Sequence, residues 1–186
     1  FALQFALTEL WAERGVRPDL LFGDGSGEYA AACAAGIFSV EDALRLVAAR
    51  GRLLQAPEGD AASAAAFERE LSRVSFHPPV RPIVACAAGA LAAGPAMARP
   101  EFWRQQIAAP VRVVESIAAL GAAGATLFVE LGPRPMLCAV GAKALPDPAL
   151  RWLPSFAGAG DDGAALAGAT AAIYAAGGDI DWLAYH

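Results

Sequence analysis

The sequence predicts an α/β fold in which helices flank a mainly parallel β-sheet. Short apolar runs alternate along the chain with segments whose apolar residues recur at helical spacing, a pattern typical of parallel sheets. The glycine-rich residues 23–27 (GDGSG) follow the first apolar run and precede a helix-forming segment, which predicts a tight strand-to-helix turn. A length of 186 residues fits one domain, residues 1–186.

In the first half of the chain we expect four helices and two strands. Gly15 ends the first helix, and Ser39 is placed to cap the third, with Asp42 in the capping-box position. The third helix should bury one apolar face, and the segment 57–60 should break it. That face comprises Ala43, Leu44, Leu46, Val47, Leu53 and Leu54. The expected helices cover residues 3–14, 28–33, 40–55 and 61–72, and the strands 20–22 and 83–86.

The second half continues the alternation of strands and helices. Pro100 should open a helix that carries Phe102 and Trp103, because proline is favoured in a first helical turn. A buried strand is expected at 126–131, after which the segment 132–135 turns the chain into another helix. Further helices are expected at 111–123 and 164–176, and an extended segment at 152–154.

Composition and charge exclude several classes of function. With 14 Lys and Arg against 19 Asp and Glu, the net charge is −5, and no basic cluster is present that could bind nucleic acid. No apolar stretch is typical of a membrane span. Cys33, Cys86 and Cys138 are widely spaced, so we expect buried free thiols in a reducing cytoplasm, with no metal site and no cofactor.

Several strings, in order, resemble the acyltransferase domain of modular polyketide synthases. The segment 23–36, with its Gly-x-x-x-Gly-Glu pattern, is similar to the family's Gly-His-Ser-x-Gly-Glu motif and the helix after it. Further similar strings follow in the family's order and together cover nearly the whole chain. They are residues 38–44, 49–55, 102–103, 110–112, 128–133 and 178–182.

The resemblance implies the large, α/β-hydrolase-like subdomain of a malonyl-CoA:acyl carrier protein transacylase, within a multidomain synthase. In the family, the motif serine is acylated, a histidine takes its proton, and backbone amides stabilise the oxyanion. An alignment without gaps places Asp24 at the motif histidine and Gly25 at the serine, so this resemblance assigns no catalytic residue. Ser26 lies one residue later, where we interpret it as a helix-start residue that satisfies free amides.

The family's ferredoxin-like small subdomain should leave the chain after Gln55 and return before residue 61. Only residues 56–60 cover that gap, so the subdomain and the catalytic histidine that follows it are expected to be missing. His77 precedes two prolines and is interpreted as a loop histidine, and His186 as a frayed end.

Some acyl-pocket positions remain recognisable, and we expect a vestigial acyl pocket there. Arg50 matches the arginine that pairs with the carboxylate of malonyl units, although a solvated helix arginine is an equal alternative. Gln106 resembles the position whose backbone carbonyl steadies the catalytic histidine. The vestigial acyl pocket comprises Asp24, Gly25, Ser26, Gly27, Arg50 and Gln106.

These losses favour an inactive acyltransferase domain, kept as a structural spacer or a docking surface. Its expected partners are the neighbouring ketosynthase, the acyl carrier protein and an acyltransferase acting in trans. A working enzyme that uses Ser26 and Arg50 is the alternative, and it lacks an evident general base. A third interpretation is that the chain omits residues of a longer domain, which would restore the histidine but not the serine.

Overall fold

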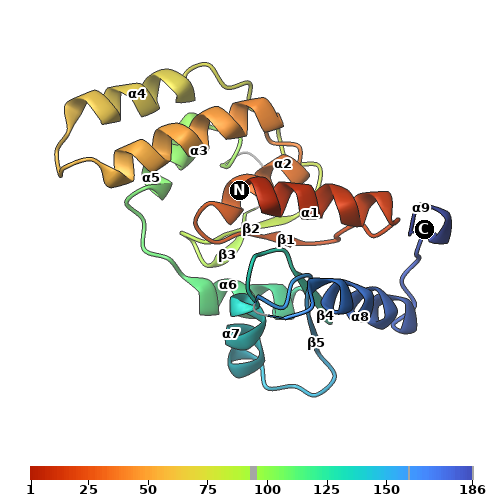
Figure 1. Ribbon diagram of the computed structural model, residues 1–186. Coiled ribbons are helices and arrows are strands. Elements are labelled where there is room, and N and C mark those ends of the chain that lie inside the picture. The colour runs from red at the N-terminus through yellow and green to blue at the C-terminus, as the bar shows by residue number, and fades with distance from the viewer. Residues whose placement is uncertain (93–95, 159, 186) are drawn as a thin grey trace. The chain divides into compact units, whose positions relative to one another are not determined.

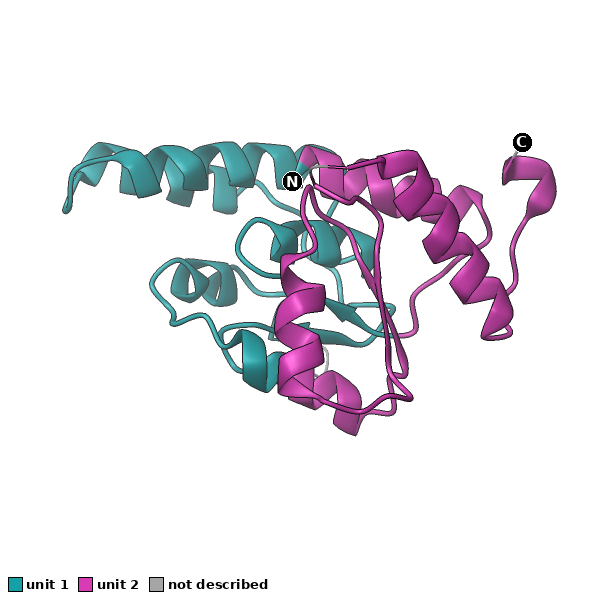
Figure 2. Ribbon diagram, turned by 60° about the horizontal axis from the view of Figure 1, so that its bottom comes forward, with its two compact units in different colours: residues 1, 20–116 teal, residues 2–19, 117–186 magenta. Residues whose placement is uncertain are grey.

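The computed structural model describes residues 1–92, 96–158 and 160–185 (Figure 1). Helices and strands alternate along the chain, as the sequence predicts. The chain divides into two compact units, which Figure 2 colours separately. The first unit contains residues 1 and 20–116, and the second contains residues 2–19 and 117–186.

A three-stranded sheet forms the centre of the first unit, in the order β1 (Leu21–Phe22), β2 (Ile83–Ala85) and β3 (Ala90–Ala92). Strands β1 and β2 are parallel, which confirms the expected mainly parallel arrangement. Strand β3 pairs antiparallel with β2 and was not predicted, because its alanine-rich sequence has low β-propensity. The connecting turn uses Gly89 at a φ of +61°.

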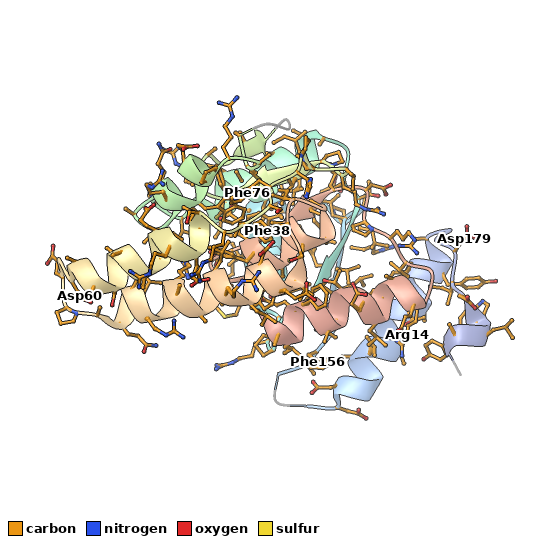
Figure 3. All side chains as sticks on the ribbon, turned by 90° about the horizontal axis from the view of Figure 1, so that it is seen from above. Arg14, Phe38, Asp60, Phe76, Phe156 and Asp179 are labelled. Atoms are coloured by element: carbon orange, nitrogen blue, oxygen red, sulfur yellow. The ribbon has the colours of Figure 1, made fainter. Side chains whose placement is uncertain are left out.

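The first unit also contains four helices at sequence positions close to those expected, and α3 and α4 lie side by side (Figure 1). The Ser39 side chain accepts a hydrogen bond of 3.1 Å from the Asp42 amide, which confirms the predicted cap. Helices α3 and α4 form a hairpin joined by residues 56–60, with Asp60 at its tip in Figure 3. The helices are α2 (Gly27–Ala34), α3 (Val40–Gln55), α4 (Ala61–Leu71) and α5 (Pro100–Gln106).

The predicted apolar face of α3 is partly wrong. Ala43 and Leu46 are fully buried, whereas Leu44 is 50% exposed and Leu54 is 53% exposed. Residues at spacings of three and four share a helix face, and the buried stripe follows the spacing of Ala43 and Leu46, which turns Leu44 outward.

Aromatic packing joins α2 and α5 to the segments that carry Phe38 and Phe76. The ring centroids of Tyr29 and Trp103 are 4.7 Å apart, and those of Phe38 and Trp103 are 5.0 Å apart. Phe38 also lies beside Phe76, as Figure 3 shows. The buried Trp103 indole donates a hydrogen bond of 2.9 Å to the Met97 carbonyl, so its polar atom is satisfied.

A two-pronged ion pair on the surface joins α4 to α5. Arg104 donates hydrogen bonds of 2.6 and 2.7 Å to the two oxygens of Glu68, and this lowers the pKa of Glu68. Both side chains are nearly half exposed, so solvent screens the pair. We expect Arg104→Gln to reduce the free energy of unfolding by less than about 1 kcal/mol, measured by urea denaturation. A larger loss of unfolding free energy would contradict the view that solvent screens this ion pair.

The second unit contains a two-stranded parallel sheet, β4 (Leu127–Glu130) and β5 (Arg151–Pro154). Phe128 and Trp152 stack across it with centroids 4.0 Å apart. Trp11 is buried and donates a hydrogen bond of 2.9 Å to the Ser155 hydroxyl. The helices are α1 (Ala2–Glu13), α7 (Met136–Ala144), α8 (Asp162–Ala175) and α9 (Trp182–Tyr185).

Helix α6 (Val113–Ala122) contains the boundary between the units. The short α9 was not predicted, whereas the helices for which the sequence gives both bounds begin and end within a few residues of them. Among the described residues, no helix has the length and apolar character that crossing a membrane would require.

Candidate functional site

The strand-to-helix turn that the sequence predicts is the centre of the candidate site. Strand β1 ends at Phe22, and α2 begins at Gly27, whose amide donates a hydrogen bond of 2.8 Å to the Asp24 carbonyl. A Cβ atom on Gly23 would lie 2.3 Å from the carbonyl carbon and oxygen of Gly27. The turn therefore closes only with glycine at position 23.

Gly25 occupies the partly exposed apex of this turn. Its φ is +56°, in the left-handed region, where a side chain is strained, and a Cβ atom built on it meets nothing within 4 Å. In a nucleophile elbow, a strained turn of this kind projects the nucleophile away from the backbone. Here the apex and the open space beside it are retained, but there is no side chain to react.

Ser26 lies one residue further on, in a different backbone conformation. Its φ of −69° and ψ of −19° are helical, and its hydroxyl makes no capping hydrogen bond to α2. The interpretation that Ser26 satisfies free helix amides is therefore wrong. Effective caps have an extended backbone, and the helical backbone of Ser26 does not place its hydroxyl over those amides.

Glu28, the second residue of α2, is fully buried beneath the turn. One carboxyl oxygen accepts a hydrogen bond of 3.0 Å from the Cys86 amide, and the other accepts one of 2.9 Å from the Gln106 side chain. Desolvation raises the pKa of Glu28 above its ordinary value of 4.5 and outweighs the lowering by these hydrogen bonds and by the charge of Arg50. The carboxyl group thus joins the turn to β2 and α5.

Arg50 lies beside this buried group, with its Nε buried and the residue as a whole only partly exposed. Its guanidinium carbon lies 5.9 Å from the centre of the Tyr29 ring, within reach of a cation–π contact. Its charge lowers the pKa of Glu28 and opposes the desolvation that raises the pKa of Tyr29. We call Glu28, Tyr29, Arg50 and Gln106 the Glu28 cluster.

Three polar atoms of the Glu28 cluster are buried and have no hydrogen-bond partner among the described residues: the Tyr29 hydroxyl, the Arg50 Nε and the Gln106 Oε1. A half-turn of the Gln106 amide would bring its carbonyl oxygen to the Glu28 oxygen 2.9 Å away. That carbonyl would accept a hydrogen bond from protonated Glu28, which fits the raised pKa.

The sequence predicts the positions of Arg50 and Gln106 but assigns them different tasks. The Gln106 side chain binds Glu28, and the Arg50 charge acts on Glu28 and Tyr29. The central role of Glu28 was missed. A signal was available, since a glutamate followed by an alanine-rich helical run needs an internal partner if that helix is buried.

His77 does not join this group. It is exposed in the segment before β2, and its backbone amide donates a hydrogen bond of 2.8 Å to the Ile37 carbonyl. The interpretation as a loop histidine is confirmed, and His186 lies outside the described residues.

The three cysteines are free thiols. Cys86 and Cys138 are buried as expected, whereas Cys33 is only partly buried. Burial raises the pKa of Cys33 and of Cys138 to about 12, so neither thiol is poised as a nucleophile at neutral pH. Among the described residues, no group of His, Cys, Asp and Glu side chains could hold a metal ion.

In the second unit, Glu130 explains one of the recognised strings. Its carboxylate, at the end of β4, accepts hydrogen bonds of 2.9 and 2.7 Å from the amides of Leu137 and Cys138. It therefore satisfies free amides at the start of α7, a position where the helix dipole favours negative charge.

Comparisons with known proteins agree with this geometry. The family model described as the acyl transferase domain matches residues 1–93. Mycoketide-CoA synthase of Mycobacterium tuberculosis is 30% identical over 252 positions, which include 99% of this chain and 6% of that protein. A PKS-NRPS hybrid synthetase of Aspergillus candidus is 27% identical over 261 positions, with 100% of this chain and 10% of that protein covered.

Comparison with solved structures also finds acyltransferase domains of polyketide synthases. The acyltransferase domain from the second module of the salinomycin polyketide synthase has a TM-score of 0.89 and 27% identity, with 99% of this chain and 60% of that domain covered. An acyltransferase domain of an iterative polyketide synthase in enediyne biosynthesis has a TM-score of 0.80 and 25% identity, with 97% and 63% covered. This chain thus spans less than two thirds of those domains. The chain belongs to the acyl transferase domain family, and it resembles the acyltransferase domains of polyketide synthases.

Proposed function

We propose that this chain is a non-catalytic acyltransferase domain of a polyketide synthase, kept as a structural spacer or as a docking surface. Gly25 carries this proposal. It occupies the apex where an elbow presents its nucleophile, it has the left-handed backbone of that position, and it cannot be acylated.

The missing base supports the same conclusion. Among the described residues His77 is the only histidine, and it is exposed on a loop. The connection between α3 and α4 consists only of residues 56–60, whereas the alignment with mycoketide-CoA synthase runs over 252 positions against 186 residues here. The relatives therefore carry long insertions that this chain lacks, which fits the loss of the ferredoxin-like subdomain together with the catalytic histidine.

Arg50 by itself would suit the alternative of a working enzyme. A malonyl-binding arginine needs its guanidinium free for a carboxylate. The Arg50 side chain is partly exposed and forms no ion pair among the described residues. The alternative still lacks a nucleophile at the apex of the turn, and His77, the histidine of the described residues, is exposed on a loop.

The partners of this role would be the neighbouring ketosynthase, the acyl carrier protein and an acyltransferase acting in trans, all in the cytoplasm. Curated relatives are polyketide synthases, and one solved neighbour is a malonyl-transacylase in complex with a type II acyl-carrier protein. No cofactor is needed for a spacer or a docking surface.

Incubation with radiolabelled malonyl-CoA tests the proposal. We expect the wild-type chain and Ser26→Ala to retain only background label, while a catalytic acyltransferase domain serves as the positive control. We also expect Gly25→Ser to stay below about a tenth of that control, because a base typically contributes 10²–10⁴-fold. Stable labelling of the wild-type chain that Ser26→Ala abolishes would overturn the proposal.

A further inference from the structure

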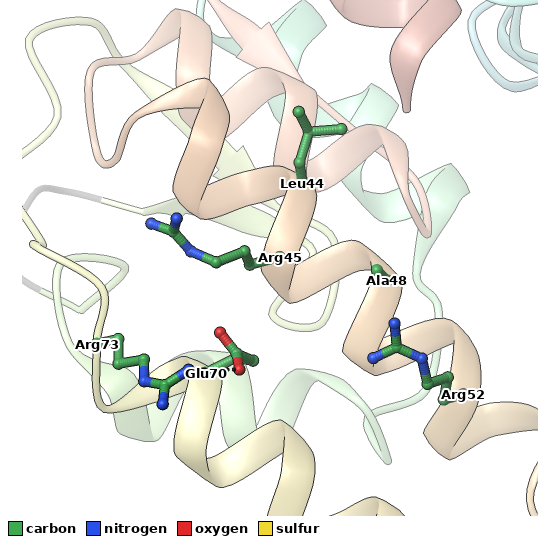
Figure 4. A pocket seen from close by; sticks show the side chains of 6 residues that line it. All are labelled: Leu44, Arg45, Ala48, Arg52, Glu70 and Arg73. Carbon is green, nitrogen blue, oxygen red and sulfur yellow. Dashed lines mark hydrogen bonds and ion pairs between the residues drawn. The ribbon is translucent and has the colours of Figure 1, made fainter.

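An open groove runs between α3 and α4 on the outside of the first unit, away from the Glu28 cluster residues. Figure 4 shows its lining, with Arg45 and Arg73 toward one end and Arg52 toward the other. The lining residues are Leu44, Arg45, Ala48, Arg52, Glu70 and Arg73. The lining holds three arginines and one glutamate, and Asp42 pairs with Arg45, so the groove has a net charge of +1, whereas the chain as a whole carries −5.

The arginines keep donors available for a partner. Arg45 pairs with Asp42 and Arg73 pairs with Glu70, each within its own turn of chain, and their side chains remain 52% and 65% exposed. A guanidinium has five N–H donors, so one carboxylate does not saturate it. Arg52 is exposed and forms no ion pair within the described residues.

The spacing of these side chains matches a helix. Arg45 and Arg52 are seven residues apart on α3, which is two turns and about 10 Å along the axis. Leu44, Ala48 and Arg52 follow at four-residue spacing and form one row along α3, and Leu44 is 50% exposed. A facing helix with two carboxylates two turns apart, and an apolar residue beside Leu44 and Ala48, would meet all four side chains.

We propose that the α3–α4 groove is a docking site for an acidic amphipathic helix of a partner protein. Charge complementarity selects an acidic occupant, and the exposed Leu44 beside the small Ala48 favours a helix with an apolar stripe. This site would be the surface through which the proposed docking domain binds its partner. Its biological role therefore rests on the proposed function, whereas binding of the helix itself does not.

The test is fluorescence anisotropy of the full chain with a labelled synthetic helix of about 20 residues. The probe carries glutamates at positions i and i+7 with leucine between them, and a second probe carries lysines instead. We expect the acidic probe to bind and its Kd to rise about tenfold in Arg52→Glu and in Arg45→Glu, but less than about twofold in Arg69→Glu. Arg69 is an exposed arginine of α4 outside the groove, so it is the matched control.

Equal weakening by Arg69→Glu, equal binding of the lysine probe, or no binding of the acidic probe would overturn the proposal. Tighter binding of a single-stranded oligonucleotide, lost in the Arg52→Glu variant, would overturn it as well, because the groove would then be a phosphate site. None of these results changes the outcome of the malonyl-CoA labelling, so the two proposals fail separately.

Discussion

Gly23→Ala is expected to reduce the free energy of unfolding by more than about 4 kcal/mol, a large part of the about 5–15 kcal/mol that is typical of a domain. Its Cβ would lie 2.3 Å from the Gly27 carbonyl group and 2.4 Å from the Glu28 nitrogen, and all of these are backbone atoms that cannot rotate away. The turn must then open, which pulls the start of α2 away from β1. Urea denaturation followed by circular dichroism measures this loss.

Two other glycines are the controls for this prediction. Gly25→Ala meets nothing within 4 Å but must hold a φ of +56°, so we expect a cost of about 1–2 kcal/mol. Gly51 lies within α3 with open space around it, and Gly51→Ala should stabilise the chain by about 0.5–1 kcal/mol. Equal losses of unfolding free energy in Gly23→Ala and Gly25→Ala would contradict this geometry, in which only a Cβ atom on Gly23 meets backbone atoms.

Glu28→Ala is expected to cost about 3 kcal/mol or more. It removes the acceptors of two buried hydrogen bonds, leaves the Cys86 amide and the Gln106 side chain without partners, and opens a cavity. Glu28→Gln preserves the volume and one acceptor, so it should cost less. Glu58→Ala, in the exposed connection 56–60, is the control and should change stability by less than about 0.5 kcal/mol.

The raised pKa of Glu28 also predicts a pH dependence with a definite sign. The folded chain holds this proton more tightly than the unfolded chain, whose glutamate titrates near 4.5. The stability that Glu28 contributes is therefore greatest below that pH and falls as the pH rises through the pKa of the folded chain. The free energy of unfolding of the wild type relative to Glu28→Gln should thus decrease from acid to neutral pH. If this difference in the free energy of unfolding increased with pH instead, the hydrogen bonds and the charge of Arg50 would lower the pKa of Glu28 by more than desolvation raises it.

Much of the fold could be predicted because local signals agree with the tertiary structure. Three local signals each specify one element. The cap at Ser39 marks the start of α3, Gly15 follows the end of α1, and the buried run Ile83–Ala85 forms β2. Strand β3 could not be predicted in this way, since alanines form a strand there only through pairing with β2. The outward position of Leu44 likewise depends on which stripe of α3 packs inward.

The candidate site could be predicted in position but not in chemistry. The motif spacing predicts that Gly25, Arg50 and Gln106 belong to one region, and the structure relates Arg50 and Gln106 through the Glu28 carboxyl group. Glu28 is buried because α2 is buried on all sides near its start, and this depends on contacts with β2 and α5 that are distant in sequence. The Ser26 hydroxyl accepts no capping hydrogen bond from the amides of α2, and this follows from the backbone of the turn, which sequence alone does not fix.

The most direct test of the central claim is the intact mass of the chain after incubation with malonyl-CoA, with Ser26→Ala measured in parallel. The apex of the turn is Gly25, so the account predicts an unmodified mass for both proteins under conditions that fully acylate a catalytic acyltransferase domain. A malonyl adduct on the wild-type chain that is absent from Ser26→Ala would contradict it.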